Sequence, residues 1–118
     1  MRATRAFTLV EVAVATVVLA VGVLAALASA RAAQRLATLG DRVARAAEVA
    51  GSRFEQLRAA GCAVAGGGTA SHHGVAETWS VATGPGAVAA DIVVTFVADN
   101  QARTVRFHGS WPCAPPAP

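Results

Sequence analysis

Apolar residues fill the chain from Ala6 to Ala30 almost without interruption, and Glu11 is the only ionisable residue among them. As an α-helix this run would extend roughly 37 Å, which exceeds the roughly 30 Å of hydrocarbon in a bilayer. The pattern therefore predicts a membrane-spanning helix over residues 7–30, preceded by a short polar leader at residues 1–6.

The helical pattern continues beyond Arg31, although the composition changes there. Charged residues now appear, and most of them lie off one apolar stripe. The stripe has the spacings of three and four that are typical of a buried helix face, at Leu36, Leu39, Val43, Ala46, Ala50, Phe54 and Leu57. Gly61 suits the position just after a helix end. We therefore expect one continuous helix whose second half, over residues 31–60, is amphipathic.

The remaining region, residues 61–118, carries turn and strand signals. Residues 61–74 are rich in glycine and predict a loop. Enrichment in β-branched residues or alternation predicts three strands, at Val75–Val81, Asp91–Ala98 and Ala102–His108. The turns are expected at Gly84-Pro85-Gly86 and Asp99-Asn100-Gln101, and the proline-rich tail at Pro112–Pro118 is expected to be irregular.

These elements predict an α+β fold, with a long N-terminal helix packed on an antiparallel sheet of about three strands. The apolar face of the sheet is expected to include Val94, Phe96, Val105 and Phe107. Such a face needs a cover, and the amphipathic half of the helix is the element long enough to provide it.

Charge adds a prediction of topology. The formal net charge is +3, and Arg2 and Arg5 both precede the apolar run. Under the positive-inside rule they hold the N-terminus in the cytoplasm, so that the C-terminus lies in the periplasm. The rest of the chain is near neutrality, and the basic balance therefore indicates topology rather than a nucleic-acid surface.

Cys62 and Cys113 are the only two cysteines. In a small exported domain an even cysteine count predicts a disulfide, which would contribute roughly 4 kcal/mol in the chain-entropy model. Two free buried thiols are one alternative. A zinc site that adds a histidine is another, although no paired-ligand spacing appears; the candidates are His72, His73 and His108.

The sequence around the start of the apolar run reads RAFTLVEV over residues 5–12. It resembles the signal sequence of type IV prepilins and type II secretion pseudopilins, and the resemblance extends over residues 1 to about 36. In that family a basic leader ends in a small residue, the mature chain begins with Phe, and a Glu follows four residues later. The resemblance implies that a prepilin peptidase cleaves between Ala6 and Phe7 and N-methylates Phe7. Ala6 is a departure, because the family nearly always has Gly there.

Glu11 is a candidate functional residue on physical grounds as well. An ionisable side chain within a membrane segment costs roughly 2.5–3.5 kcal/mol on insertion scales and is a functional-site hypothesis by default. The resemblance implies its partner, the N-terminal amine of Phe7 on a neighbouring subunit. That pairing would offset the burial of both charges and set the axial register between subunits.

The resemblance is nearest to minor pilins of the pilus-modification group, and it implies a subunit that primes, caps or modifies a pilus or secretion pseudopilus. Its expected partners are other pilins, the prepilin peptidase and the inner-membrane assembly platform. We expect no enzyme activity, no cofactor and no metal, because the carboxylates Glu77, Asp91 and Asp99 show no paired spacing for acid–base catalysis.

Three other interpretations remain open at this point. A pilus-tip binding module for DNA or surfaces would use Arg103, Arg106 and His108, although so few charges predict weak, salt-dependent binding. A monomeric membrane-anchored periplasmic protein would use the apolar helix as a simple anchor. A conventional signal peptide could be cleaved after Ala28-Ser29-Ala30.

Overall fold

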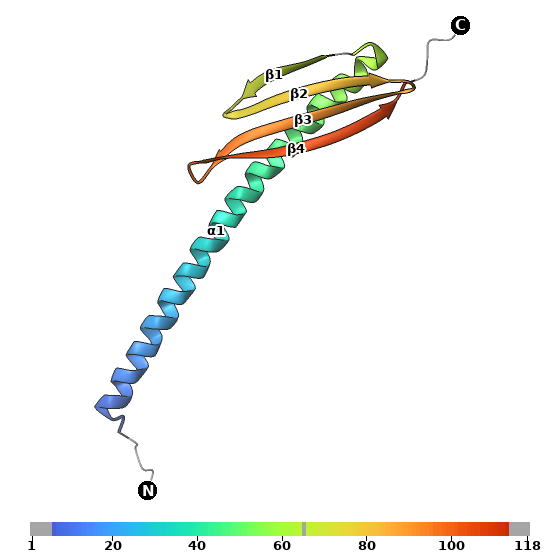
Figure 1. Ribbon diagram of the computed structural model, residues 1–118. Coiled ribbons are helices and arrows are strands. Elements are labelled where there is room, and N and C mark those ends of the chain that lie inside the picture. The colour runs from blue at the N-terminus through green and yellow to red at the C-terminus, as the bar shows by residue number, and fades with distance from the viewer. Residues whose placement is uncertain (1–5, 65, 114–118) are drawn as a thin grey trace. The chain divides into compact units, whose positions relative to one another are not determined.

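The computed structural model describes residues 6–64 and 66–113. One long helix is followed by a short 3-10 helix and an antiparallel sheet, which confirms the predicted α+β class (Figure 1). The chain divides into a first unit that ends at Thr38 and a second unit that begins at Leu39. The elements are α1 (Leu9–Ala59), η1 (Gly61–Ala63), β1 (Gly66–His72), β2 (Val75–Gly84), β3 (Ala87–Ala98) and β4 (Gln101–Pro112).

The described part of the first unit consists of the start of α1 and the three residues before it. Every described residue from Ala6 to Thr38 is exposed, including the large apolar side chains. By length and composition, α1 is a helix that can cross a membrane. An apolar surface of this extent is stable only against lipid or other apolar helices.

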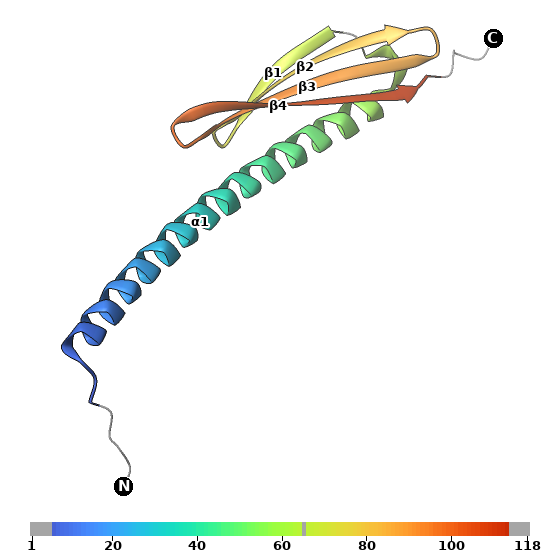
Figure 2. The ribbon, with the colours of Figure 1, turned by 60° about the horizontal axis from the view of Figure 1, so that its bottom comes forward.

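The second unit is a four-stranded sheet with the order β1-β2-β3-β4, and all neighbouring strands are antiparallel. Residues 39–59 of α1 lie along one face of this sheet (Figure 2). The core forms between that face and the predicted helical stripe, at Ala46, Ala50, Val75, Ile92, Val94, Phe96 and Ala98, with Leu39, Phe54, Trp79, Val105 and Phe107 packed around them. The predicted sheet face and its cover are thus confirmed.

The stripe is buried only in part. Ala46 and Ala50 are fully covered, whereas Val43 is 39% exposed and Leu36 is 69% exposed. The small alanines allow the helix to approach the sheet closely, and Gly109 on β4 has the same effect, because a Cβ there would lie 2.8 Å from the Phe54 ring. A contact packed this closely is sensitive to any added side-chain volume.

The strand count of about three was too low, because the expected loop at residues 61–74 contains β1. Glycine is unfavourable in strands in general, but at position 68 the packing of a residue far along the chain, Trp79, leaves no space for a side chain. A Cβ on Gly68 would lie 2.5 Å from the ring of Trp79, which is its partner on β2. The glycine-rich segment is therefore a strand that makes room for a tryptophan.

The other strands are longer than predicted, and their turns are short. β2 and β3 are joined at Pro85-Gly86, inside the expected turn. β3 and β4 are joined by Asp99-Asn100, both at positive φ (51° and 58°), so Gln101 already belongs to β4. Two residues at positive φ form the tight hairpin turn whose twist matches that of antiparallel strands.

We expect Gly68→Ala to lower the free energy of unfolding of the second unit by about 2 kcal/mol, because the added methyl group must displace the Trp79 ring. Gly51→Ala is the matched control. No atom lies within 4 Å of a Cβ built on Gly51, in the interior of α1, so this change should instead stabilise the helix by about 1 kcal/mol. Urea unfolding of the detergent-solubilised chain, followed by far-UV circular dichroism, measures both. Equal effects of the two substitutions would contradict the role given to Gly68.

Candidate functional site

The predicted cleavage site lies directly before α1. Ala6, Phe7 and Thr8 have no regular secondary structure, and the helix begins at Leu9. Phe7 is 78% exposed. The peptide bond between Ala6 and Phe7 is thus in an open segment of chain that an enzyme can reach.

Thr8 caps the helix. The backbone N–H of Glu11 donates a hydrogen bond to the Thr8 hydroxyl oxygen at 3.2 Å, and the N–H of Val12 donates to the Thr8 carbonyl at 3.2 Å. Thr8 and Glu11 have the S/T-x-x-E spacing of a capping box. The predicted helix start at Phe7 was therefore two residues too early. The cap was missed, although its spacing is readable in the sequence.

Glu11 lies in the first turn of α1 and is exposed. A carboxylate there is favoured by the partial positive charge of the helix N-terminus. Glu11 also lines a shallow surface groove of about 500 Å³ whose other lining side chains are almost all apolar, namely Phe7, Val12, Ala15, Thr16 and Leu19.

A second polar cluster is buried in the second unit. Glu77 on β2 is 2% exposed, and one of its oxygens pairs with the guanidinium of Arg53 and lies 3.5 Å from His72 Nε2. The Arg53 guanidinium also stacks on Trp79, 3.8 Å from the ring centroid. These contacts hold the β1–β2 hairpin to α1. His72, which was expected in an exposed loop, is thus the last residue of a strand.

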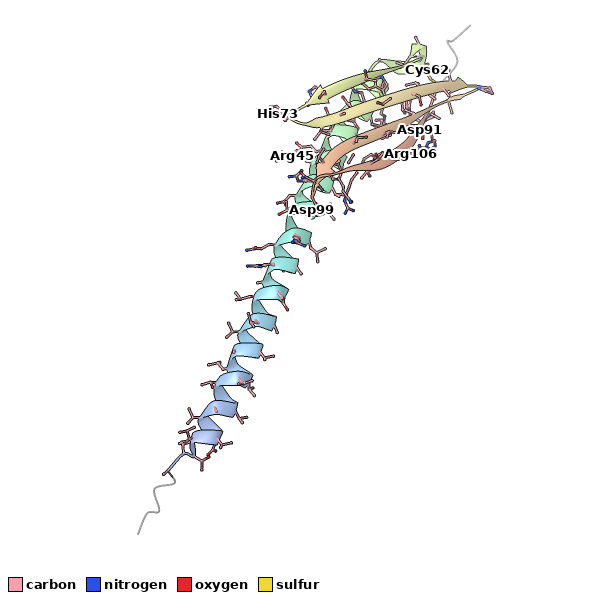
Figure 3. All side chains as sticks on the ribbon, turned by 60° about the vertical axis from the view of Figure 1, so that its left-hand side comes forward. Arg45, Cys62, His73, Asp91, Asp99 and Arg106 are labelled. Carbon is pink, nitrogen blue, oxygen red and sulfur yellow. A yellow bond between two sulfur atoms is a disulfide. The ribbon has the colours of Figure 1, made fainter. Side chains whose placement is uncertain are left out.

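The predicted disulfide is present. Cys62 in η1 is bonded to Cys113 after β4, with their Cα atoms 5.6 Å apart. The Cys113 N–H also donates to the Gly86 carbonyl at 2.8 Å. Figure 3 shows Cys62 at one end of the sheet, and His73 and Asp99 in the turns at the other end. The disulfide ties the end of β4 to the end of α1 and leaves neither thiol for a zinc ion.

The basic residues of β4 do not form one surface. Arg103 pairs with Phe96 and so shares the helix-facing side of the sheet, whereas Arg106 and His108 belong to the outer side. His108 Nδ1 is also 2.9 Å from an Asp91 carboxylate oxygen (Figure 3 labels Arg106 and Asp91). The residues expected to support DNA binding are therefore divided between two faces, because side chains alternate along a strand.

No group of three His, Cys, Asp or Glu side chains able to hold a metal ion occurs within residues 6–64 and 66–113. Within the same residues the polar side chains form structural contacts, namely a helix cap, an ion-pair cluster and hairpin pairs.

Comparison with known proteins identifies the N-terminal segment. Residues 1–27 match the family described as the prokaryotic N-terminal methylation motif. Searches of the curated proteins and of the solved structures each found no significant match. The motif indicates a structural subunit that assembles with other pilins, and with the apolar α1 it fits an inner-membrane-anchored pilin. The match supports the type IV prepilin and pseudopilin family.

Proposed function

We propose that the chain is a minor pilin or pseudopilin that primes, caps or modifies a type IV pilus or a type II secretion pseudopilus. The observation that carries this proposal is the N-terminal methylation motif directly before a helix that can span a membrane. A prepilin peptidase cleaves between Ala6 and Phe7 and methylates the new amine of Phe7. The helix then packs laterally against the helices of other subunits, as a separate ATPase drives extraction from the membrane.

The exposed carboxylate of Glu11 supports the assembly step. In the processed subunit Glu11 pairs with the Phe7 amine of a neighbour, in the apolar layer formed by adjacent helices. Glu11 and Phe7 line the same groove on one subunit, so a neighbouring helix that enters this groove meets the carboxylate. An ion pair in such surroundings is sensitive to geometry and therefore specifies one register between subunits.

The form of the second unit supports a minor role. Its strands are joined by short turns, and the described residues include no long loop between strands of the kind expected in a major adhesive pilin. The proposed topology places the second unit in the periplasm, where the Cys62–Cys113 disulfide is compatible with oxidising conditions.

The proposal is tested by intact-mass analysis of the full chain, expressed with and without a prepilin peptidase. We expect a product that begins at Phe7, with or without one methyl group, only in the presence of the peptidase. An unchanged mass in both samples would instead support a plain membrane anchor. A product that begins at Arg31 would show that Ala28-Ser29-Ala30 is a conventional signal-peptidase site.

A further inference from the structure

The start of α1 is fixed two residues after the proposed cleavage site. The Thr8 hydroxyl oxygen accepts a hydrogen bond from Glu11 N–H at 3.2 Å, and Leu9 is the first helical residue. Ala6 and Phe7 remain outside the helix. We propose that Thr8 is a positioning residue for processing, because its cap keeps the Ala6–Phe7 peptide bond out of the helix and open to the peptidase. This inference rests on the proposed function.

A cap is needed here because Ala6 and Phe7, the two residues before Thr8, do not themselves stop a helix. Ala6 has the highest intrinsic helix propensity, and Phe7 is tolerated in helices. In an apolar environment each further helical residue also satisfies backbone groups that would otherwise lack hydrogen bonds. Without the cap, α1 is expected to extend upstream through the cleavage site. The Thr8 side chain opposes this extension by occupying a donor at the helix start.

The flanking residues agree with the same helix start. With Thr8 as the N-cap, Glu11 takes the third helical position of a capping box, and Phe7 and Val12 take the two positions of a hydrophobic staple. Phe7 and Val12 both line the groove at the start of α1. Thr8, Glu11, Phe7 and Val12 thus occupy positions that favour this helix start.

The cap is expected to control how fast the peptidase cleaves the chain, and not to be a feature that the peptidase itself recognises. When opening is fast compared with cleavage, proteolysis follows the population of the open form. Loss of an N-cap shifts the balance between capped and extended helix by about fivefold, the equivalent of about 1 kcal/mol. Thr8→Val, which has the same shape but no hydroxyl, should therefore slow cleavage, by up to about fivefold where the extended helix becomes the main form. Thr8→Ser, which keeps the hydroxyl, should stay within twofold of the unsubstituted chain.

A rescue variant separates capping from direct recognition of Thr8. Leu9 is the first helical residue, where proline is well tolerated, and a proline there also disfavours helical geometry at residue 8. The double variant Thr8→Val/Leu9→Pro restores the helix start without the hydroxyl. We expect its cleavage rate to return to that of the single variant Leu9→Pro.

The experiment is a time course of cleavage of the full chain in membranes that contain the prepilin peptidase, read by intact mass. The fraction of chain with the Cys62–Cys113 disulfide reports correct insertion and should not differ among the variants. If the unsubstituted chain is not cleaved, the proposed function itself fails, and this inference with it. If that chain is cleaved and Thr8→Val is cleaved equally fast, only the capping role fails. If Thr8→Val is cleaved slowly and the double variant Thr8→Val/Leu9→Pro is still cleaved more slowly than Leu9→Pro, the peptidase recognises the threonine directly. The capping role is then overturned as well.

Discussion

Replacing Arg53 with methionine is expected to lower the free energy of unfolding of the second unit by about 3 kcal/mol. The Arg53 guanidinium pairs with the Glu77 carboxylate, which is 2% exposed. Without this cation the carboxylate stays buried, and only His72, at 3.5 Å, is left near the same oxygen. The second Glu77 oxygen already lacks a partner within the described residues, so the remaining site cannot compensate. The stacking of Arg53 on Trp79 is lost as well.

Two further variants show whether the buried charge is the cause. Arg58→Met removes an exposed arginine in the last turn of α1 that forms no ion pair with the described residues, and it should change stability by less than about 0.5 kcal/mol. The double variant Arg53→Met/Glu77→Leu removes both charges and should recover most of the lost stability. Urea unfolding with the disulfide intact measures all three. A loss in Arg53→Met no larger than in Arg58→Met would contradict the role of the pair.

The long helix and its buried stripe were predictable because their signals are local. An apolar run and a repeat of three and four residues are visible in the sequence alone, and Ala46 and Ala50 lie where the repeat places them. β1 was not predictable in this way. Its glycine-rich sequence predicts a loop. The reason for glycine at position 68 is the Trp79 ring beside it, and that contact exists only once the two strands are paired.

The residues of the candidate site also differ in whether a local sequence signal reveals them. The cleavage site and Glu11 were predicted from a motif only a few residues long. The helix cap by Thr8 could have been predicted from the same residues. The pair of Arg53 and Glu77 had no such signal, because 24 residues separate them and a helix and a strand must first meet. The residues expected to support DNA binding are divided for a simpler reason. Arg103 and Arg106 are an odd number of residues apart on β4 and therefore point to opposite faces.

Glu11→Ala is expected to leave membrane insertion intact and to reduce incorporation into filaments by at least about tenfold. The substitution removes an ionisable group from the apolar helix, so insertion becomes easier. In the proposed filament, the Phe7 ammonium of the neighbouring subunit would then lie in an apolar layer without its counter-ion, and this would make the assembled state less favourable. The measurement is the fraction of chain recovered in sheared filaments relative to membranes of the native host. Thr38→Ala is the control, because the Thr38 hydroxyl bonds to the Gln34 carbonyl of its own helix and Thr38 does not line this groove.

Two conservative variants separate the charge of Glu11 from its place in the helix cap. Glutamine can complete a capping box with Thr8 but carries no charge, whereas aspartate keeps the charge on a side chain that is one methylene shorter. If the carboxylate pairs with the Phe7 amine, Glu11→Gln should assemble as poorly as Glu11→Ala, and Glu11→Asp should fall between them and the unsubstituted chain. If the cap alone matters, Glu11→Gln should assemble normally. Normal assembly of all three variants would leave the helix as a plain anchor, since a membrane anchor requires no charge at this position.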